Sequence, residues 1–395
     1  MVAETARVAV RENASPWQRL GAWLAGPIPV SVVLALVIGG IVIAVAGKDP
    51  VTAYSSMLEG SLTGRGLANT FQRAIPIVGM AMALAIAFRA GVFNLGAEGQ
   101  MILGGLTGTL VALYLPGPGF LVMVAALVAA VLGGALWGVL SAFLQTGLGV
   151  PILITSLLLN YPARYFSSYL VRFPLKEHGS SMVATPPVPE DVRIPPLVPA
   201  DSALGQSMSE SLGRDHVLVL LTRGVNWSLV VVLVVVLLTV FVNRRTPVGY
   251  ESGMSGLNLR FARYGGVRTD RLTVWTMFVS GGISGLVGVM LVLGSQYRLI
   301  DGALLGTNYA WTGLLVALLA ASRPLGVVIA GTLFAAIVVG GEAMQRSADV
   351  SGQISQVIQA IVIVLLVIRV QLPVRSRRDP TPLLNAEPDD EVGRV

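Results

Sequence analysis

Long apolar runs separated by short polar or turn-rich stretches dominate the chain, and most are long enough to cross a bilayer as a helix. Ten runs occur, at residues 28–46, 68–88, 94–114, 120–143, 152–171, 225–242, 272–294, 307–321, 325–341 and 354–370. The eighth is the shortest and suits a partly re-entrant segment. The pattern predicts an all-α polytopic membrane protein with about ten transmembrane helices.

Polar segments divide the chain into three parts around these runs. We expect a cytoplasmic N-terminal segment at 1–26, a transmembrane domain at 27–372, and a disordered cytoplasmic tail at 373–395. Inside the transmembrane domain, residues 172–223 form a long proline-rich segment of mixed charge, which predicts an irregular exterior loop. That loop is either a spacer or a docking surface for a partner.

Composition supports the membrane assignment and narrows the chemistry. Hydrophobic residues make up 54% of the chain and charged residues only 12%, whereas about a quarter of a soluble domain is charged. The chain has no cysteine, and its only histidines, His178 and His216, both lie in the long polar segment. We therefore predict no metal site, and no cluster of catalytic groups for covalent chemistry is visible.

The net charge of +6 comes from arginines in short stretches between apolar runs, so it does not indicate nucleic-acid binding. With the N-terminus in the cytoplasm, six crossings place one arginine-rich loop inside, and four more place the C-terminal arginines inside. The even number of predicted spans and the positions of the arginines thus both place the two termini in the cytoplasm. The inside loop carries Arg244, Arg245, Arg260, Arg263, Arg268 and Arg271.

The stretch between the second and third runs carries unusual polar residues for a membrane segment: Asn94, Glu98 and Gln100. A charged carboxylate in a membrane costs about 2.5–3.5 kcal/mol on insertion scales, so it usually faces water or a bundle interior. Asn94 and Glu98 are four residues apart and are predicted to share one helical face. They either line a solute path or gate, or they form a structural joint at a helix N-terminus.

Asn160 is a second polar residue inside an apolar run, and several aromatic residues follow it. Asn160 is the stronger candidate for the solute path. Aromatic faces suit a planar heterocycle or a sugar ring, but tyrosines near the end of a span more often form a membrane-interface belt. We favour the belt for Tyr161, Tyr165, Phe166 and Tyr169.

The loop at about 243–271 combines six arginines with several glycines, and residues 257–264 are predicted to form a short helix at the membrane surface. The loop either docks a partner protein or only supplies the positive charge that orients the chain in the membrane. The only lysines, Lys48 and Lys176, do not stand in the G-x-x-x-x-G-K-[ST] pattern that holds nucleotide phosphates. If ATP drives this protein, another polypeptide must bind it.

The run 91–100, GVFNLGAEGQ, resembles the F-N-[IL]-G-x-E-G-Q signature of ABC importer permeases for nucleosides and simple sugars. This family belongs with the ribose and branched-chain amino-acid permeases. Weaker similarity comes from 157–161, LLLNY, and from 313–319 followed by Pro324-Leu325-Gly326. Within the family, the chain most resembles the longer of two paired nucleoside permeases. It departs from the pattern at 149–152 and 252–256.

The resemblance implies a type II ABC importer-like permease in a bacterial inner membrane, working by alternating access on nucleosides or similar neutral polar solutes. Implied partners are an ATP-binding subunit, a second permease chain and an extracytoplasmic solute-binding protein, besides the lipid bilayer. This chain itself binds no cofactor, since ATP and magnesium belong to the partner. The loop resembles the family's coupling helix at Gly256, Leu257, Asn258, Arg260, Ala262, Arg263, Tyr264, Gly265 and Gly266.

Two alternative functions stay open at this stage. One is a monosaccharide permease of the same architecture, similar to ribose permeases. The other is an ion-driven secondary transporter, which would hold its ion with polar groups at broken helices near the membrane midplane. Glu98 is almost the only carboxylate placed for that task.

Overall fold

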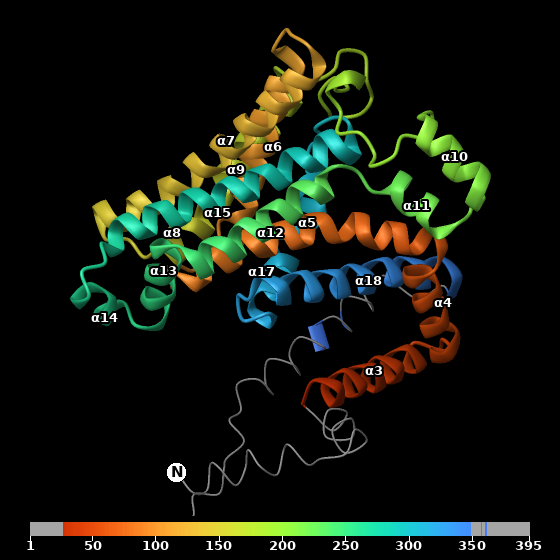
Figure 1. Cartoon of the computed structure of the whole chain (residues 1–395), viewed down its shortest axis with the longest axis horizontal. Helices are drawn as coiled ribbons and strands as arrows, with labels where there is room; N and C mark the ends of the chain where they lie inside the picture. The colour runs from red at the N-terminus through yellow and green to blue at the C-terminus, as the bar shows by residue number, and fades with distance from the viewer. Residues whose placement is uncertain (1–26, 349–356, 358–359, 362–395) are drawn as a thin grey trace, which may run out of the picture. The chain divides into compact units, whose positions relative to one another are not determined.

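The computed structural model describes residues 27–348, 357 and 360–361, and within them the chain is helical, with two isolated β-bridges and no strand. The chain divides into two compact units, and all packing described below lies in the larger one, residues 39–359. The helices are α3 (Pro27–Val45), α4 (Pro50–Leu62), α5 (Gly64–Arg89), α6 (Ala97–Tyr114), α7 (Gly119–Leu148), α8 (Ile152–Leu158), α9 (Asn160–Arg172), η1 (Glu190–Val192), α10 (Ala203–Leu212), α11 (Val217–Gly224), α12 (Ser228–Arg245), α13 (Pro247–Leu257), α14 (Leu259–Tyr264), α15 (Thr269–Leu291), η2 (Val292–Gln296), α16 (Ala303–Gly306), α17 (Tyr309–Leu319) and α18 (Pro324–Ala348) (Figure 1).

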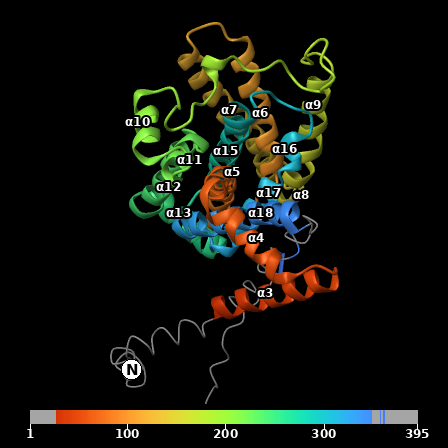
Figure 2. The same ribbon diagram turned by 90° about the vertical axis from the view of Figure 1, so that its right-hand side faces the viewer.

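Helix α5 is the central element of this unit. It packs against α4, α11, α12, α15, α17 and α18, and most of its apolar stretch is buried. Figure 2 looks nearly along α5 and shows α15, α6 and α7 on one side of it and α17 and α18 on the other. The residues of α5 therefore contact both helix groups.

Glycines allow α6, α7 and α15 to approach one another closely. A Cβ atom at Gly104 of α6 would collide with the backbone of Gly285 in α15, and one at Gly285 would collide with the carbonyl of Ala130 in α7. Gly134 and Gly281 bring the backbones of α7 and α15 into the same kind of contact. Because lipid gives no hydrophobic drive for helices to associate, such close backbone packing supplies much of the attraction.

Five helices in the described part of the chain are long and apolar enough to cross a membrane: α5, α7, α12, α15 with its η2 extension, and α18. The predicted third span begins at Ala97 and not at Asn94. Asn94 lies in the preceding loop, where its side-chain oxygen accepts a hydrogen bond from the Gly96 backbone (2.9 Å). This local bond competes with helix formation, so the prediction that Asn94 and Glu98 share a helical face was wrong.

The predicted fifth span is broken into α8 and α9 at Leu159. Pro162 explains the break, because it lacks the N–H that would bond to Leu158 and its ring clashes with that carbonyl. The indole of Trp137 donates to the Leu159 carbonyl at 3.2 Å. The seventh span ends in the π-helical turn η2, and the eighth is a helix of only 11 residues, α17.

Several helices were not expected from the sequence. They are α4, which begins at an Asp49 cap followed by Pro50; α13, in the loop at 243–271; and α10 and α11, inside the segment predicted to be irregular. All four are too short for their apolar positions to form a clear run. The N-terminal segment 1–26, most of the tenth run and the tail 373–395 lie outside the described residues.

Candidate functional site

The predicted path residues Asn94 and Gln100 meet in a buried polar network beside α15. The Asn94 amide nitrogen donates to Gln100 Oε1 and to Ser280 Oγ, both at 2.9 Å, and Asn94 Oδ1 accepts from Gln100 Nε2 at 3.1 Å. Ser280 in turn donates to the Ala83 carbonyl of α5 at 2.7 Å. Asn94, Gln100 and Ser280 are each 0% exposed. The network therefore joins α5, α6 and α15 with its polar groups satisfied.

Asn160 holds the same loop from the side of the broken α8–α9 helix. Its Oδ1 accepts from the Gly99 backbone at 2.8 Å, and its Nδ2 donates to the Leu95 carbonyl at 2.9 Å. Ser156 Oγ accepts from the Leu95 backbone at 3.1 Å. A Cβ at Gly99 would approach Asn160 Oδ1 to 2.9 Å. Glycine at this position thus lets the break in one helix pack against the first turn of another.

Glu98 is the charged member of this region and contacts two other helices. Its carboxylate pairs with the Arg164 guanidinium of α9 at 2.7 Å and accepts from the Trp311 indole of α17 at 3.2 Å. The Glu98 side chain is 10% exposed and the Arg164 side chain 39% exposed. Glu98 therefore links α6, α9 and α17, and Arg164 extends from it toward the surface.

The structure brings all four predicted residues together, and its geometry is that of a joint between helices. Sequence reasoning missed Ser280, Arg164 and Trp311. Ser280 and Trp311 carry no local signal, whereas Arg164 is a charged residue inside the predicted fifth span and could have been found by the rule that singled out Glu98. Tyr161, Tyr165 and Tyr169 of α9 are each more than half exposed, and the Tyr161 ring packs on the Arg164 guanidinium, 5.8 Å from the ring centroid. The membrane-interface belt stays a prediction for these aromatic residues.

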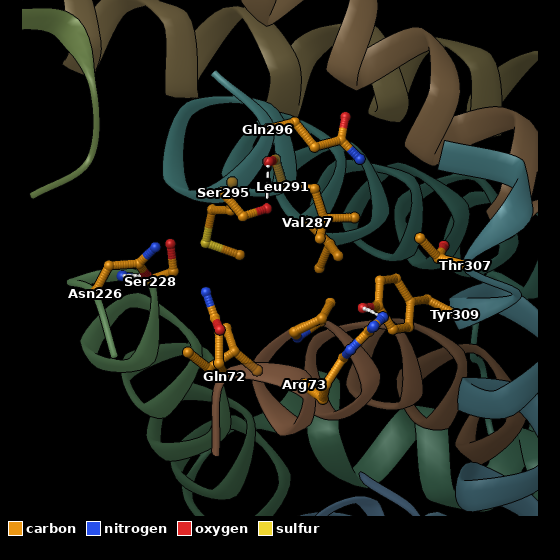
Figure 3. Close-up of a pocket in the computed structure, with 13 residues that line it drawn as sticks. Gln72, Arg73, Asn226, Ser228, Val287, Leu291, Ser295, Gln296, Thr307 and Tyr309 are labelled. Carbon is orange, nitrogen blue, oxygen red and sulfur yellow. Dashed lines mark hydrogen bonds between the residues drawn. The ribbon is translucent and has the colours of Figure 1, made fainter. Parts of the chain in front are cut away.

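A cavity of about 280 Å³ lies between α5, α12, α15, η2 and α17, and no sequence motif pointed to it. Figure 3 shows Asn226 and Ser228 on one side, Thr307 and Tyr309 on the opposite side, and Gln72 and Arg73 along the α5 edge. Apolar side chains complete the wall. The lining residues are Gln72, Arg73, Ile75, Pro76, Asn226, Ser228, Val287, Met290, Leu291, Ser295, Gln296, Thr307 and Tyr309.

Two departures from regular helix accompany this cavity. Pro76 lies inside α5 and cannot donate to the Gln72 carbonyl, the usual partner in an α-helix. The turn η2 is π-helical and ends at Tyr297, whose φ of 57° is left-handed. Asn226 braces the turn, donating to the Gly294 carbonyl at 2.8 Å and accepting from the Ser228 backbone at 3.1 Å. Single π-helical turns of this kind occur frequently at functional sites.

The one formal charge on the cavity wall is already paired. Arg73 contacts Glu342 of α18 at 2.8 Å and donates to the Tyr309 hydroxyl at 3.0 Å. Two neutral groups are in the opposite situation: within the described residues, Ser228 Oγ and Gln296 Oε1 are buried atoms with no hydrogen-bond partner. Ser228 as a whole is 3% exposed. The cavity is thus lined by neutral residues and one compensated charge, and the two unpartnered atoms beside it have almost no accessible surface.

The loop at 243–271 folds as the helix pair α13–α14. Asn258 caps α14 by accepting from the Phe261 backbone at 3.0 Å, and Ala262, fully buried, packs with Val267 and Leu272. Leu257, Phe261 and Tyr264 are 91%, 62% and 92% exposed. A surface cleft of about 750 Å³ adjoins the pair, lined also by Phe88, Arg89, Ala321 and Ser322. Leu257 and Tyr264 belong to the predicted coupling loop, but the sequence did not reveal that they are exposed together with Phe261 at its tip.

Arg260 and Arg263 both belong to the predicted coupling loop, and of these two only Arg263 has a side-chain partner among the described residues. Arg263 donates to Thr269 Oγ1 at 2.9 Å and lies 3.7 Å from the Asp270 carboxylate. At the other end of the pair, Gly256 packs on the backbone of Arg89 and Gly91, next to the loop that holds Asn94. The helix pair therefore contacts the segment that leads into the buried network.

No group of three or more histidine, cysteine, aspartate or glutamate side chains able to hold a metal occurs within the described part of the chain. The site has the features of a membrane transport protein: apolar spanning helices, a buried polar joint and a polar cavity. Residues 66–367 match the permease component of branched-chain amino acid transport systems, and the chain belongs to this family of ABC transporter permeases. It is a membrane-embedded transport subunit.

Three relatives illustrate the similarity. The chain is 32% identical to a glucose ABC transporter permease of Haloferax volcanii, over 89% of this chain and 90% of that one. It is 25% identical to a guanosine permease of Bacillus subtilis over 85% and 91% of the two chains. It is 24% identical to a nucleoside permease of Lactococcus lactis subsp. cremoris over 87% and 92%. No solved structure matches.

Proposed function

We propose that this chain is the translocation subunit of an ATP-driven importer for nucleosides or similar neutral polar solutes. Family membership over residues 66–367 carries the proposal, together with the guanosine and nucleoside permeases among the relatives. Membership in an ABC permease family argues against the ion-driven alternative. It also suggests an ATP-binding subunit, where hydrolysis takes place, and a solute-binding protein as partners.

Monosaccharides are the second candidate class of solute. The observation favouring them is that this chain is 32% identical to the glucose permease of Haloferax volcanii over the aligned residues, against 24–25% for the two nucleoside permeases. ATP-driven uptake of labelled guanosine, uridine, D-glucose and D-ribose into proteoliposomes holding the whole complex would decide between the classes. Uptake driven by a proton gradient without ATP would contradict the proposal.

We further propose about ten spans in a type II importer arrangement, with both termini in the cytoplasm and a second permease chain completing the path. The distribution of arginines supports the orientation. On this arrangement α13–α14 lies in the cytoplasm, and residues 172–223 lie outside. Asn94, Glu98, Gln100 and Asn160 would then form a wall of the path, with the three amides fixing its shape and Glu98, linked to the partly exposed Arg164, lying nearest to water.

The helix pair α13–α14 is our proposed docking site for the ATP-binding subunit. Its exposed Leu257, Phe261 and Tyr264 resemble the apolar and aromatic anchors that supply most of the energy of protein interfaces. Gly256 of this pair contacts the backbone of Gly91, just before the loop that holds Asn94. Movement of the docked subunit would therefore be transmitted to the buried network.

Replacing two of these anchors provides the test. We expect Leu257→Asp with Phe261→Asp to reduce co-purification of the ATP-binding subunit at least tenfold, since two apolar anchors are lost. Arg260→Glu should have a smaller effect, because exposed charges mainly set association rate and register. Leu204→Asp on α10, where Leu204 is 69% exposed, is the matched control and should leave co-purification unchanged. Normal co-purification of the double variant would show that α13–α14 is not the docking site.

A further inference from the structure

One face of helix α9 is exposed and carries aromatic and polar side chains instead of aliphatic ones. Its members recur at helical spacing and form what we call the α9 face: Tyr161, Arg164, Tyr165, Ser168 and Arg172. Exposed positions on α7 and α12, two helices apolar enough to span a membrane, are apolar: Val128, Leu132, Leu136, Val234, Leu237 and Phe241. The exposed surfaces of α7 and α12 therefore suit lipid, whereas the α9 face suits water.

The depth of the α9 face in the proposed fifth span sharpens this contrast. Arg164 lies twelve residues after Ile152, where α8 begins, and eight before Arg172, where α9 ends. At about 1.5 Å per residue, Arg164 is about 12–18 Å from either end of a span that crosses a core about 30 Å thick. A charged side chain at such a depth faces a bundle interior or water. Tyr161 and Tyr165 lie at a similar depth, so a belt at the membrane surface does not explain them.

Arg164 offers one nitrogen to a molecule outside the chain. Its Nη2 is bound to the Glu98 carboxylate at 2.7 Å, and its Nε is buried. The remaining nitrogen, Nη1, makes no hydrogen bond within the described residues and is not enclosed, and the side chain as a whole is 39% exposed. Nη1 can therefore donate a hydrogen bond to a molecule at the α9 face.

Aromatic rings lie next to this guanidinium. The Tyr161 ring centroid is 5.8 Å from Arg164 Cζ, and Tyr161 is 52% exposed. The Trp311 indole donates to the other oxygen of Glu98 at 3.2 Å and is 44% exposed. Tyr165, the next residue in the chain after Arg164, is 68% exposed. Three accessible rings thus surround one available hydrogen-bond donor.

This combination restricts the ligand. Glu98 already balances the charge of Arg164, so the face does not require an anion, and the guanidinium disfavours a cation. Accessible aromatic rings stack on flat heterocycles, because every base has a π-face. A nucleobase also carries carbonyl oxygens or ring nitrogens that can accept from Nη1. A monosaccharide can accept this hydrogen bond but has no π-face to stack.

We infer that the α9 face, together with Trp311, is the wall along which the solute passes, and that it contacts the planar ring of a nucleoside. Tyr161 and Tyr165 stack on that ring, and Arg164 donates to an acceptor on it. The inference rests on the proposed function and deepens it by naming the helix face and the part of the solute that it recognises. Glu98 is then a positioning residue, because it holds Arg164 and Trp311 in place.

Single cysteines can report whether water reaches the α9 face, because the chain contains no cysteine of its own. Tyr165→Cys is compared with Leu237→Cys, since Tyr165 and Leu237 are 68% and 66% exposed and Leu237 lies in the middle of α12. The whole complex in proteoliposomes is treated with a charged, water-soluble methanethiosulfonate, and labelling of this chain is followed by mass spectrometry. The thiolate is the reactive form and needs water, so we expect Tyr165→Cys to react at least about tenfold faster.

Equal labelling rates in the two cysteine variants would show that lipid or the second permease chain covers the α9 face. That result would overturn the inference whether or not the complex transports guanosine. The labelling experiment therefore separates failure of this inference from failure of the proposed function.

ATP-driven uptake of labelled guanosine by the same proteoliposomes tests recognition of the ring. Tyr165→Leu should lower uptake about five- to tenfold, the factor that one stacked ring represents, whereas Tyr165→Phe keeps a ring and should retain most of it. Arg164→Lys keeps a charge beside Glu98 but loses the planar guanidinium, and should lower uptake about fivefold. Phe241→Leu on α12, where Phe241 is 58% exposed, is the matched control and should be normal.

Uptake is compared at equal amounts of each variant in the membrane. Normal guanosine uptake in both Tyr165→Leu and Arg164→Lys, or an equal loss in Phe241→Leu, would overturn the inference. A wild-type complex that takes up D-glucose but not guanosine would also overturn the assignment of a planar ring. Uptake of neither probe with ATP would instead show that the proposed function is wrong, and the labelling rates would then decide alone whether water borders the α9 face.

Discussion

The buried network around Asn94 and the cavity beside η2 are both polar regions inside an apolar helical domain, yet their hydrogen-bond balance differs. In the network, each amide of Asn94 and Asn160 is bonded on both its oxygen and its nitrogen. In the cavity, Ser228 and Gln296 keep atoms that bond to nothing within the described residues. A satisfied polar group contributes to the fold, whereas an unsatisfied one costs stability. Mutations in the two regions should therefore affect different quantities.

The largest effect on stability is expected from Asn94→Ala. The substitution removes four hydrogen bonds and leaves both ends of the Gln100 amide and the Gly96 N–H unpaired, while Ser280 keeps its bond to the Ala83 carbonyl. Each buried group left unpaired costs about 1–3 kcal/mol, so we expect a loss of about 3 kcal/mol or more. Thermal unfolding of the purified protein in detergent, with its level in the membrane, measures the loss. Wild-type stability combined with reduced uptake would make Asn94 a solute contact.

Asn160→Ala should have the next largest effect on stability. Asn226→Ala, beside the cavity, is the matching variant for comparison. Both side chains make two hydrogen bonds that involve backbone groups, so both variants should lose about 2 kcal/mol of stability. Asn160→Ala should also lower uptake per folded molecule, because Asn160 belongs to the proposed wall of the solute path and Asn226 does not. Equal uptake per folded molecule in the two variants would remove this distinction between the regions.

Glu98→Gln should have a modest effect of about 1 kcal/mol. The amide still accepts from the Trp311 indole, and the lost ion pair is discounted because the Arg164 side chain is 39% exposed. Unfolding measured at low and high salt should show a smaller salt dependence in the variant than in the wild type. If uptake falls tenfold while stability is unchanged, Glu98 belongs to the solute path itself and is not only part of the joint.

Ser228→Ala is expected to change stability the least, and in contrast to the other variants it should not lower it. Removing an unpaired buried hydroxyl should leave the protein as stable as the wild type, or up to about 1 kcal/mol more stable. The same detergent unfolding measurement applies, without added solute. A destabilisation of about 2 kcal/mol would mean that the hydroxyl supports the fold, and the contrast between cavity and network would then be lost.

The sequence by itself determined that this chain is surrounded by lipid and is a polytopic membrane protein. Runs such as 120–143 and 325–341 are long and almost wholly apolar. A water-soluble fold could not bury all of these residues, whereas in a bilayer they can face lipid. The polar residues Asn94, Glu98, Gln100 and Asn160 were detectable because each is exceptional among apolar neighbours. Their clustering was also predictable in part, since three of the four lie within seven residues of the chain.

Only the tertiary structure decided which atoms meet. Ser280, Arg164 and Trp311 complete the network from segments that are distant in sequence, and no local pattern encodes such pairings. The cavity was equally hidden, because Gln72, Asn226 and Gln296 are unremarkable until α5, α12 and η2 pack together. Whether a polar group is satisfied depends on neighbours supplied by the whole fold. That property separates a structural joint from a binding site, and it has no signature in a single chain segment.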